Sequence, residues 1–227
     1  MTSITVTIAK ITNLLPLNQF LSYLIGLDTF NGNSHKTQNM KTIIATITLT
    51  FALFAQAAED DGWVSLFNGK DLSGWIKMND VQCEVNNGLL KIVKGMGWLC
   101  YDKEFKDFIL ELEWRALDEQ YDSGIFIRCG KEGKPWPIDG WQINLRYSAI
   151  GGLVRGYKNM VPAETSKQPL NKWVKMRIEV KGKKVSLTIN DEPNWEFNEL
   201  DRDSGYIGIQ IENKVFEFRN IRIKELK

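Results

Sequence analysis

The sequence is poor in the residues that most often perform catalysis or hold metal ions. Its 227 residues include a single His, His35, and three Cys. The cysteines, Cys83, Cys100 and Cys129, have none of the Cys-x-x-Cys spacings of metal or redox sites, and an odd number cannot form a complete disulfide framework. One bridge between Cys83 and Cys100, or three buried thiols, are the two alternatives that the sequence leaves open.

The chain also lacks an excess of charge of either sign. It has 29 Lys and Arg against 28 Asp and Glu, a formal net charge of +1. The composition therefore gives no argument for binding nucleic acid or an anionic membrane. With 43% apolar and 25% charged residues, the chain is expected to fold as a globular protein, and its eight Trp are many for this length.

Residues 40–57 are typical of a secretory signal peptide. A lysine precedes an apolar segment from Ile43 to Phe54, and Ala55-Gln56-Ala57 provides a small-residue cleavage site. The apolar segment is shorter than the ~20 residues of a membrane-spanning helix. We interpret residues 1–39 as an upstream leader or a mis-assigned start, residues 40–57 as the signal peptide, and residues 58–227 as a single domain that is periplasmic or secreted.

Cleavage after Ala57 would remove His35 and leave a chain without histidine. Ser-His-Asp catalysis, Cys-His catalysis and His-ligated metal sites would then be excluded. The loss of three Lys and one Asp would make the remaining formal charge slightly negative. The sequence identifies no cofactor. A Ca²⁺ ion held by loop carbonyls and Asp side chains is the metal site that it leaves as an alternative.

From Trp63 onward, short alternations of apolar and polar residues recur between turns rich in Gly, Asn and Asp, with no long helical period. The expected strands are Val64–Phe67, Gln82–Val85, Leu89–Val93, Trp98–Tyr101, Phe108–Ala116, Gly124–Cys129, Trp141–Arg146, Trp173–Lys181, Lys184–Ile189, Gly205–Glu212 and Val215–Lys224. So many strands need two packed faces to bury a core. The sequence predicts an all-β domain, a two-sheet antiparallel sandwich or jelly roll.

Four of these strands separate an apolar side from a polar side. The polar sides carry Glu113, Arg115, Arg128, Gln142, Asn144, Arg146, Gln210 and Glu212. Planar amide, guanidinium and carboxylate groups can hydrogen-bond neighbouring sugar hydroxyls. An ordinary solvated face is the alternative, but Lys is absent from these sets, which favours a binding cleft.

The tryptophans divide in the same way. Trp114 and Trp141 fall on the apolar side of their strands, which predicts that they pack in the core. Trp98 and Trp136 stand next to Gly or Pro, where an aromatic ring could stack on a sugar ring. Simple packing is an equal alternative for both.

Four segments of the chain closely resemble the 3-keto-disaccharide hydrolase family, also described as a 3-keto-glucoside 1,2-lyase and 3-keto-2-hydroxy-glucal hydratase domain. They are Trp63–Trp75, Asp107–Arg115, Ser123–Arg128 and Phe218–Leu226. They occur in the family's order, and the resemblance covers Gly62–Lys227. It implies a concanavalin A-like jelly roll in an exported bacterial protein, with the site on a concave sheet.

The resemblance also implies a chemistry that needs no histidine. When a partner oxidoreductase has converted the C3 hydroxyl of a sugar to a ketone, the C2 proton becomes acidic, and a base can remove it as the C1 aglycone leaves. Water then adds to the resulting glycal. Such a site needs a base and a cationic group for the enolate oxygen. The candidates for acid and base are Glu113, Asp122, Asp139 and Glu212, and those for the cation are Arg115, Arg128 and Arg146.

Three positions depart from the family pattern. Gly140 stands where a Glu usually precedes Gln142 by two residues, and Glu212 ends a strand in which a His often follows Gln210. Arg155, which we predict to bind the substrate, stands where a Tyr is usual. These differences keep two alternatives open, a non-catalytic carbohydrate-binding module and a conventional glycoside hydrolase. The second would need a carboxylate pair, for which Glu113 and Glu212 are the candidates.

Overall fold

The computed structural model describes residues 61–163 and 168–227. The predicted leader, signal peptide and His35 lie outside the described residues. The described residues contain strands and turns but no helix, so no helix among them is long and apolar enough to cross a membrane.

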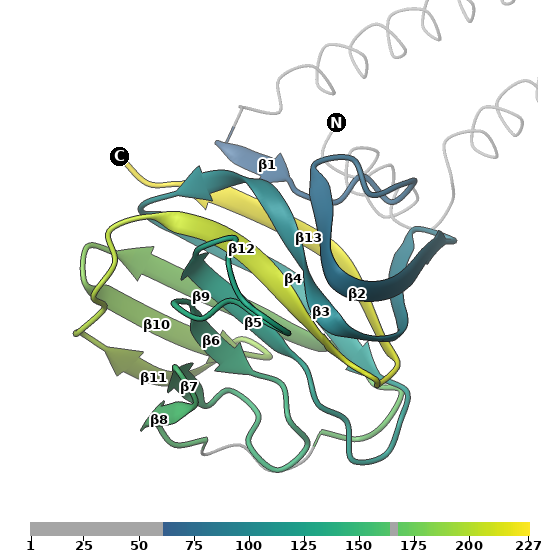
Figure 1. The fold of residues 1–227 in the computed structure, drawn as a ribbon. Coiled ribbons are helices and arrows are strands. Elements are labelled where there is room, and N and C mark those ends of the chain that lie inside the picture. Colours follow the sequence, from purple (N-terminus) through teal and green to yellow (C-terminus); the bar gives the residue numbers. More distant parts are fainter. Residues whose placement is uncertain (1–60, 164–167) are drawn as a thin grey trace, which may run out of the picture. The chain divides into compact units, whose positions relative to one another are not determined.

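Thirteen strands make up the domain (Figure 1). They are β1 Trp63–Ser65, β2 Trp75–Asn86, β3 Leu89–Phe105, β4 Phe108–Ala116, β5 Gly124–Cys129, β6 Trp141–Asn144, β7 Leu153–Arg155, β8 Lys158–Val161, β9 Val174–Lys181, β10 Lys184–Ile189, β11 Glu192–Phe197, β12 Gly205–Glu212 and β13 Phe216–Glu225. Every pairing is antiparallel, in the order β11-β10-β9-β4-β13-β3-β12-β5-β6-β7-β8, with β1 on β13 and β2 on β3.

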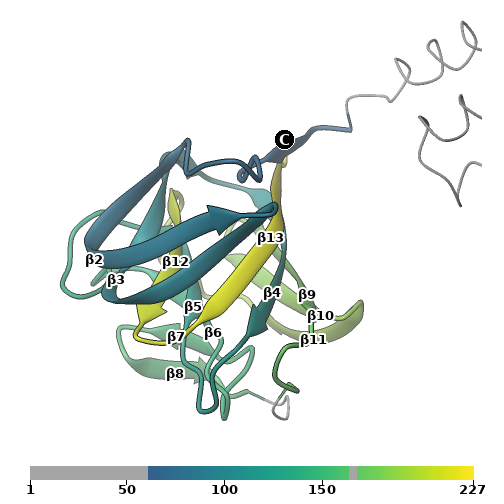
Figure 2. The ribbon, with the colours of Figure 1, turned by 90° about the vertical axis from the view of Figure 1, so that its right-hand side faces the viewer.

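Two layers form because β3 belongs to both halves of this order. Its first part, Leu90–Ile92, pairs with β13, and its later part, Met96–Phe105, pairs with β12. We call β11-β10-β9-β4-β13 the back sheet and β12-β5-β6-β7-β8 the front sheet. Figure 2 shows β5 to β8 to the left of β9 to β11. The predicted two-sheet antiparallel jelly roll is confirmed.

The core lies between the two sheets. Leu112, Trp114 and Ile178 of the back sheet share one buried cluster with Ile143 and Ile209 of the front sheet. Because successive side chains of a strand point to opposite faces, the polar residues between these positions lie on the outside. We call the two outer surfaces the back face and the front face.

The strand predictions fail where glycine, proline or short length hides the pattern. Gly95 and Gly97 lie inside the single strand β3, where a Cβ on either would come within 2.2 Å of a carbonyl oxygen of β2. Here glycine permits close backbone approach and does not end the strand. β11 contains Pro193, which is tolerated because this strand is at the edge of the sheet. The short strands β7 and β8 were also not predicted.

The cysteines form no disulfide. Cys83, Cys100 and Cys129 are all free, and the last two are buried. Burial raises the pKa of Cys100 to about 11 and raises that of Cys129 further. No bridge joins Cys83 and Cys100, and the alternative of buried thiols is correct for Cys100 and Cys129 but not for Cys83, which is half-buried.

Candidate functional site

Most of the predicted polar residues of β6 and β12 meet in one groove on the front face. The groove has a volume of about 360 Å³. We call it the front groove, and its lining is Asp122, Trp136, Gln142, Asn144, Arg146, Val154, Tyr157, Asn159, Gln210 and Glu212. Residues predicted from three separate stretches of the chain are thus brought together by the pairing of β12, β5 and β6.

A row of amides crosses the floor of the groove. Gln142 Nε2 donates a hydrogen bond to Gln210 Oε1, and Gln210 Nε2 donates to Glu212 Oε2 at 2.7 Å. The row crosses β5 at Gly124, where a Cβ would come within 2.1 Å of Gln142 Nε2. The absence of a side chain at Gly124 therefore lets Gln142 reach Gln210 and so fixes the orientation of Glu212.

Two carboxyl groups of the groove are poorly solvated. Burial raises the pKa of Asp122, and the charges of Arg146 and Lys214 only partly oppose this. Burial also raises the pKa of Glu212, and the nearby charge of Asp122 raises it further, against the effect of Arg146. A carboxylate whose ionised form is destabilised in this way is a stronger base than one in water.

Arg146 supplies positive charge next to this pair. Its Nε lies 3.5 Å from Asp122 Oδ2, and more than half of its side chain is exposed. The main chain holds these residues in place, because the Leu145 amide donates to the Ser123 carbonyl and the Tyr147 amide donates to the Tyr121 carbonyl. A guanidinium at this position can stabilise an anion that forms in the groove.

An aromatic residue and a hairpin complete the walls. Trp136 lines the groove, and its Nε1 donates to the Ile211 carbonyl at 3.2 Å. Tyr157 and Asn159 come from the β7–β8 hairpin and were not predicted as site residues. The signal for them was Gly156, which has a φ of 52° in the two-residue turn before Lys158 and marks a tight hairpin.

Arg128, predicted as a ligand for the substrate, lies outside the front groove. Its side chain is fully buried and donates to the carbonyls of Lys106, Gly182 and Arg202 and to Asp107 Oδ1. The φ of Arg128 is 46°, in the left-handed region. The backbone near the end of β5 therefore does not follow the regular strand alternation on which the prediction was based. Its guanidinium holds loops together and is not open to a ligand in the groove.

Trp98 also differs from its prediction as a stacking platform. It is fully buried in a small second core cluster with Cys100, Phe126 and Cys129, against which Trp136 packs. A ring without exposed surface cannot stack on a sugar. Of the two predicted platforms, only Trp136 lines the groove.

Asp139 and Arg155 pair with other residues beside the groove and do not line it. Asp139 accepts from the Gly130 amide and from Arg202. Arg155 donates to Asp201 Oδ2 at 3.0 Å and lies over the ring of Trp141. Both side chains therefore hold neighbouring loops together.

Glu113 and Arg115 belong to the back face, because β4 is in the back sheet. Glu113 accepts from Arg219 at 2.8 Å and from Asn220 at 2.7 Å, and Arg115 pairs with Glu217. Glu113 and Glu212 therefore lie on opposite outer faces of the sandwich. This excludes them as the paired carboxylates of a conventional glycoside hydrolase, which must flank one bond.

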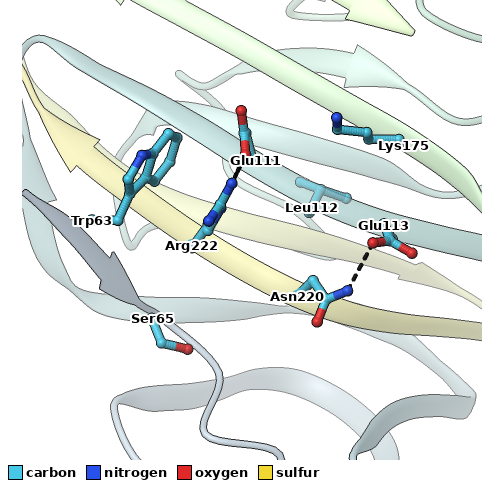
Figure 3. A pocket seen from close by; sticks show the side chains of 8 residues that line it. All are labelled: Trp63, Ser65, Glu111, Leu112, Glu113, Lys175, Asn220 and Arg222. Carbon is cyan, nitrogen blue, oxygen red and sulfur yellow. Dashed lines mark hydrogen bonds and ion pairs between the residues drawn. The ribbon is translucent and has the colours of Figure 1, made fainter. Parts of the chain in front are cut away.

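The back face has a larger hollow, of about 600 Å³, between β1, β4, β9 and β13 (Figure 3). Glu111 in this hollow accepts hydrogen bonds from Arg222 and Arg177. Burial alone would raise the pKa of Glu111, but these two arginines outweigh it and the pKa is lowered. Its charge is already neutralised within the sheet, so it is a poor base.

Within residues 61–163 and 168–227, no group of three or more His, Cys, Asp or Glu is arranged to hold a metal ion.

The fold is shared with solved structures that include a candidate glycosyl hydrolase, a carbohydrate-binding module and a protein with a galectin-like fold. A candidate glycosyl hydrolase from Parabacteroides distasonis ATCC 8503 is 22% identical, with a TM-score of 0.62 over 74% of this chain and 95% of that one. The carbohydrate-binding module CBM66 from Bacillus subtilis is 14% identical, with a TM-score of 0.56 over 67% and 96%. A Bacillus subtilis protein with a galectin-like fold is 13% identical, with a TM-score of 0.57 over 72% and 94%.

The comparison with curated proteins gave no match. The family model of the 3-keto-alpha-glucoside-1,2-lyase-like domain, in contrast, matches residues 62–224, nearly the whole of the described domain. This agrees with the four segments from which the resemblance was inferred. The protein is a carbohydrate-active protein that belongs to the 3-keto-alpha-glucoside-1,2-lyase-like domain family.

Proposed function

We propose that the protein cleaves 3-keto-glycosides in the front groove, by elimination followed by hydration. The observation that carries this proposal is the pair of carboxyl groups with raised pKa, Asp122 and Glu212, beside the exposed guanidinium of Arg146. A base of this kind next to a cation suits removal of a proton that leaves an enolate behind. Family membership supports the same reaction.

In the first step, a carboxylate removes the C2 proton of the 3-keto sugar. We assign this role to Glu212, because Gln210 fixes its orientation from one side while burial and Asp122 make it more basic. The electrons of the C2–H bond form the enolate with the C3 ketone, and Arg146 stabilises its oxygen. The C1–O bond to the aglycone then breaks as the C1=C2 double bond forms.

In the second step, water adds to the 3-keto-2-hydroxy-glucal. Its hydroxyl bonds to C1, its other proton goes to the aglycone anion released in the first step, and the carboxylic acid formed in that step returns a proton to C2. The carboxylate is regenerated and the net result is hydrolysis of the glycosidic bond. The substrate must come from an oxidoreductase that oxidises the C3 hydroxyl of a glycoside, which is the partner activity that we propose.

The test is release of 4-nitrophenol from 4-nitrophenyl 3-keto-α-glucoside by the purified protein, followed by absorbance. The control is the same glucoside before oxidation, whose C2 proton is not acidified. We expect release only from the keto form, and at a lower rate with Glu212→Gln. If no 4-nitrophenol is released beyond the amount seen in buffer alone, in the presence of any of a series of divalent metal ions, the catalytic proposal is contradicted.

A second candidate function is carbohydrate binding without turnover. It is favoured by the open aromatic and amide lining, because Tyr157 is 83% exposed beside Trp136 and Gln142. Calorimetry with oxidised and unoxidised glucosides separates the two candidates. Saturable binding of either sugar without product would identify a binding module.

A further inference from the structure

Next to the front groove lies a second, shallow depression of different chemistry, which we call the apolar hollow. It is lined by Phe126, Trp136, Pro137, Ile138, Gly140, Gln142, Val154, Gly156 and Tyr157. It shares Trp136, Gln142, Val154 and Tyr157 with the front groove. The two depressions are therefore continuous, one polar and one largely apolar.

We propose that the apolar hollow binds the leaving group and that the preferred substrates are 3-keto-glucosides with an aromatic aglycone. The inference rests on the proposed function, because it assigns the two ends of one substrate to the two depressions. The sugar ring lies among Asp122, Arg146 and Glu212, and the aglycone lies against Trp136, Ile138 and Tyr157.

The exposure of the lining supports a bound apolar group. Ile138 is 73% exposed and Tyr157 is 83% exposed, and both are among the few large apolar side chains that the described domain leaves in solvent. Both line this one hollow. Covering such surface is favourable by about 25 cal/mol per Å², so an aglycone that lies across both side chains is stabilised.

The shape of the hollow favours a flat ring. Its enclosed volume is only about 30 Å³, so a group must lie on its surface and cannot be surrounded by it. Aromatic rings stack well on Trp and Tyr side chains in such open sites. A second sugar would bring hydroxyl groups, for which this lining offers few partners beyond Gln142 and the Tyr157 hydroxyl.

Gly140 lines the apolar hollow at a position with no room for a side chain. A Cβ at this position would come 2.7 Å from the Cys129 Cβ and 3.5 Å from the Phe126 ring. A side chain at this position would clash with the buried Cys129, so the close packing of the floor requires glycine here. The residue that departs from the family's Glu pattern thus also leaves this surface without an acid.

The absence of acids from the lining points to the same substrates. No Asp, Glu, Lys or Arg lines the hollow in the described part of the chain, so the hollow itself offers the aglycone no acid. The acids nearest the departing oxygen, Asp122 and Glu212, belong to the front groove, where Glu212 is assigned as the base. A phenolate is a far more stable anion than the alkoxide of a sugar, so an aromatic aglycone leaves without such help.

The experiment compares phenyl and methyl 3-keto-α-glucosides as substrates of the wild-type protein and of Ile138→Ser and Tyr157→Ala. The ratio of kcat/KM for phenyl over methyl is compared between proteins, which cancels the intrinsic difference between the leaving groups. We expect the ratio to fall on the order of fivefold in each variant. Val64→Ser is the matched control, because Val64 is also exposed, at 55%, but is on β1.

A binding assay keeps this inference separate from the proposed function. Calorimetry with unoxidised phenyl and methyl α-glucosides should show tighter binding of the phenyl ligand to the wild-type protein and loss of this preference in Ile138→Ser. If neither keto-glucoside is cleaved but the phenyl preference is present, the proposed function fails and the apolar hollow stands. Equal ratios in the wild type and both variants, or no phenyl preference in calorimetry, would overturn the inference.

Discussion

The two outer faces of the sandwich carry similar residue types but use them differently. On the back face, the acidic side chains Glu111 and Glu113 are each hydrogen-bonded to arginines of neighbouring strands. On the front face, Glu212 is held by an amide and lies near another acid, Asp122. The pKa is lowered for Glu111 and Glu113 and raised for Asp122 and Glu212.

The difference in pKa between the two faces is a better guide to the catalytic site than the volume of the two depressions. The hollow on the back face, of about 600 Å³, is larger than the front groove, of about 360 Å³. Arginine and glutamate that neutralise one another hold the strands of the back sheet together, whereas partly buried carboxyl groups with an incomplete set of cations retain chemical reactivity. The front face is therefore the better candidate for catalysis.

The largest expected effect is on activity and separates the two faces directly. Glu212→Gln should lower the rate of aglycone release by about 10²–10⁴-fold, because it removes the base. Glu113→Gln, the matched change on the back face, should leave the rate unchanged. Equal losses in the two variants would contradict the assignment of the site to the front face.

The next effect concerns stability and tests the interpretation of Arg128. Arg128→Met should lower the free energy of unfolding by about 3–5 kcal/mol, because the carbonyls of Lys106, Gly182 and Arg202 lose this donor and Asp107 keeps only the Gly182 amide. Arg146→Met, on the exposed rim of the front groove, should change stability by less than about 1 kcal/mol. Denaturant titration of both variants checks this, and a mild effect of Arg128→Met would argue against its role in holding the loops.

A smaller effect is expected from the row of amides. Gly124→Ala should displace Gln142 and lower activity by about tenfold or more through loss of the fixed orientation of Glu212. Its thermal unfolding should change little, because Gln142 can move toward solvent. Gly182→Ala, in the β9–β10 turn, is the control: a Cβ there meets nothing within 4 Å, but a φ of 58° strains the backbone, so this variant shows whether lower stability away from the groove reduces activity. Normal activity in Gly124→Ala would show that the amide row does not position Glu212.

The smallest effect is the opposite dependence of stability on pH for the two faces. Glu212 has a raised folded pKa, so its ionisation costs stability as the pH rises through that value, and Glu212→Gln should unfold at a slightly higher temperature near neutral pH. The gain should vanish below the ordinary pKa of 4.5. Glu111 has a lowered folded pKa, so its ionised form stabilises the protein above the ordinary value, and this contribution is lost as the pH falls through the lowered pKa.

Glu111→Gln should therefore lower the unfolding temperature near neutral pH, with little effect in strong acid. Both changes should remain below about 1 kcal/mol because of solvent screening. Thermal unfolding of both variants across the acidic range measures them. Shifts of the same sign would contradict the electrostatic difference between the faces.

The sequence was sufficient for the fold because strands such as β4, β5, β10 and β12 alternate clearly, and their predicted bounds are those of the structure. Alternation also identified the residues that turn away from the core. It could not show that Glu113 and Gln210 face opposite sides of the molecule, because the periodicity of a single strand says nothing about the sheet to which it belongs. Only the path of β3 from one sheet to the other separates them.

The sequence could not predict the surroundings of several other residues, because these depend on tertiary contacts or on very short strands. Arg128 follows the strand pattern, but its left-handed backbone conformation and the loops that surround it are set by tertiary contacts. Tyr157 and Asn159 come from a hairpin whose strands are too short to alternate visibly. Asp122 was predicted from its charge alone, and its partial burial depends on the pairing of residues 121–123 with residues 145–147.

The most direct test of the central claim is a crystal structure of the protein with the product 3-keto-glucose. The account predicts the sugar in the front groove, with its C2 next to Glu212, its ketone oxygen toward Arg146, and amide contacts from Gln142 or Gln210. A sugar bound instead in the back-face hollow, over Trp63 and Glu111, would contradict it.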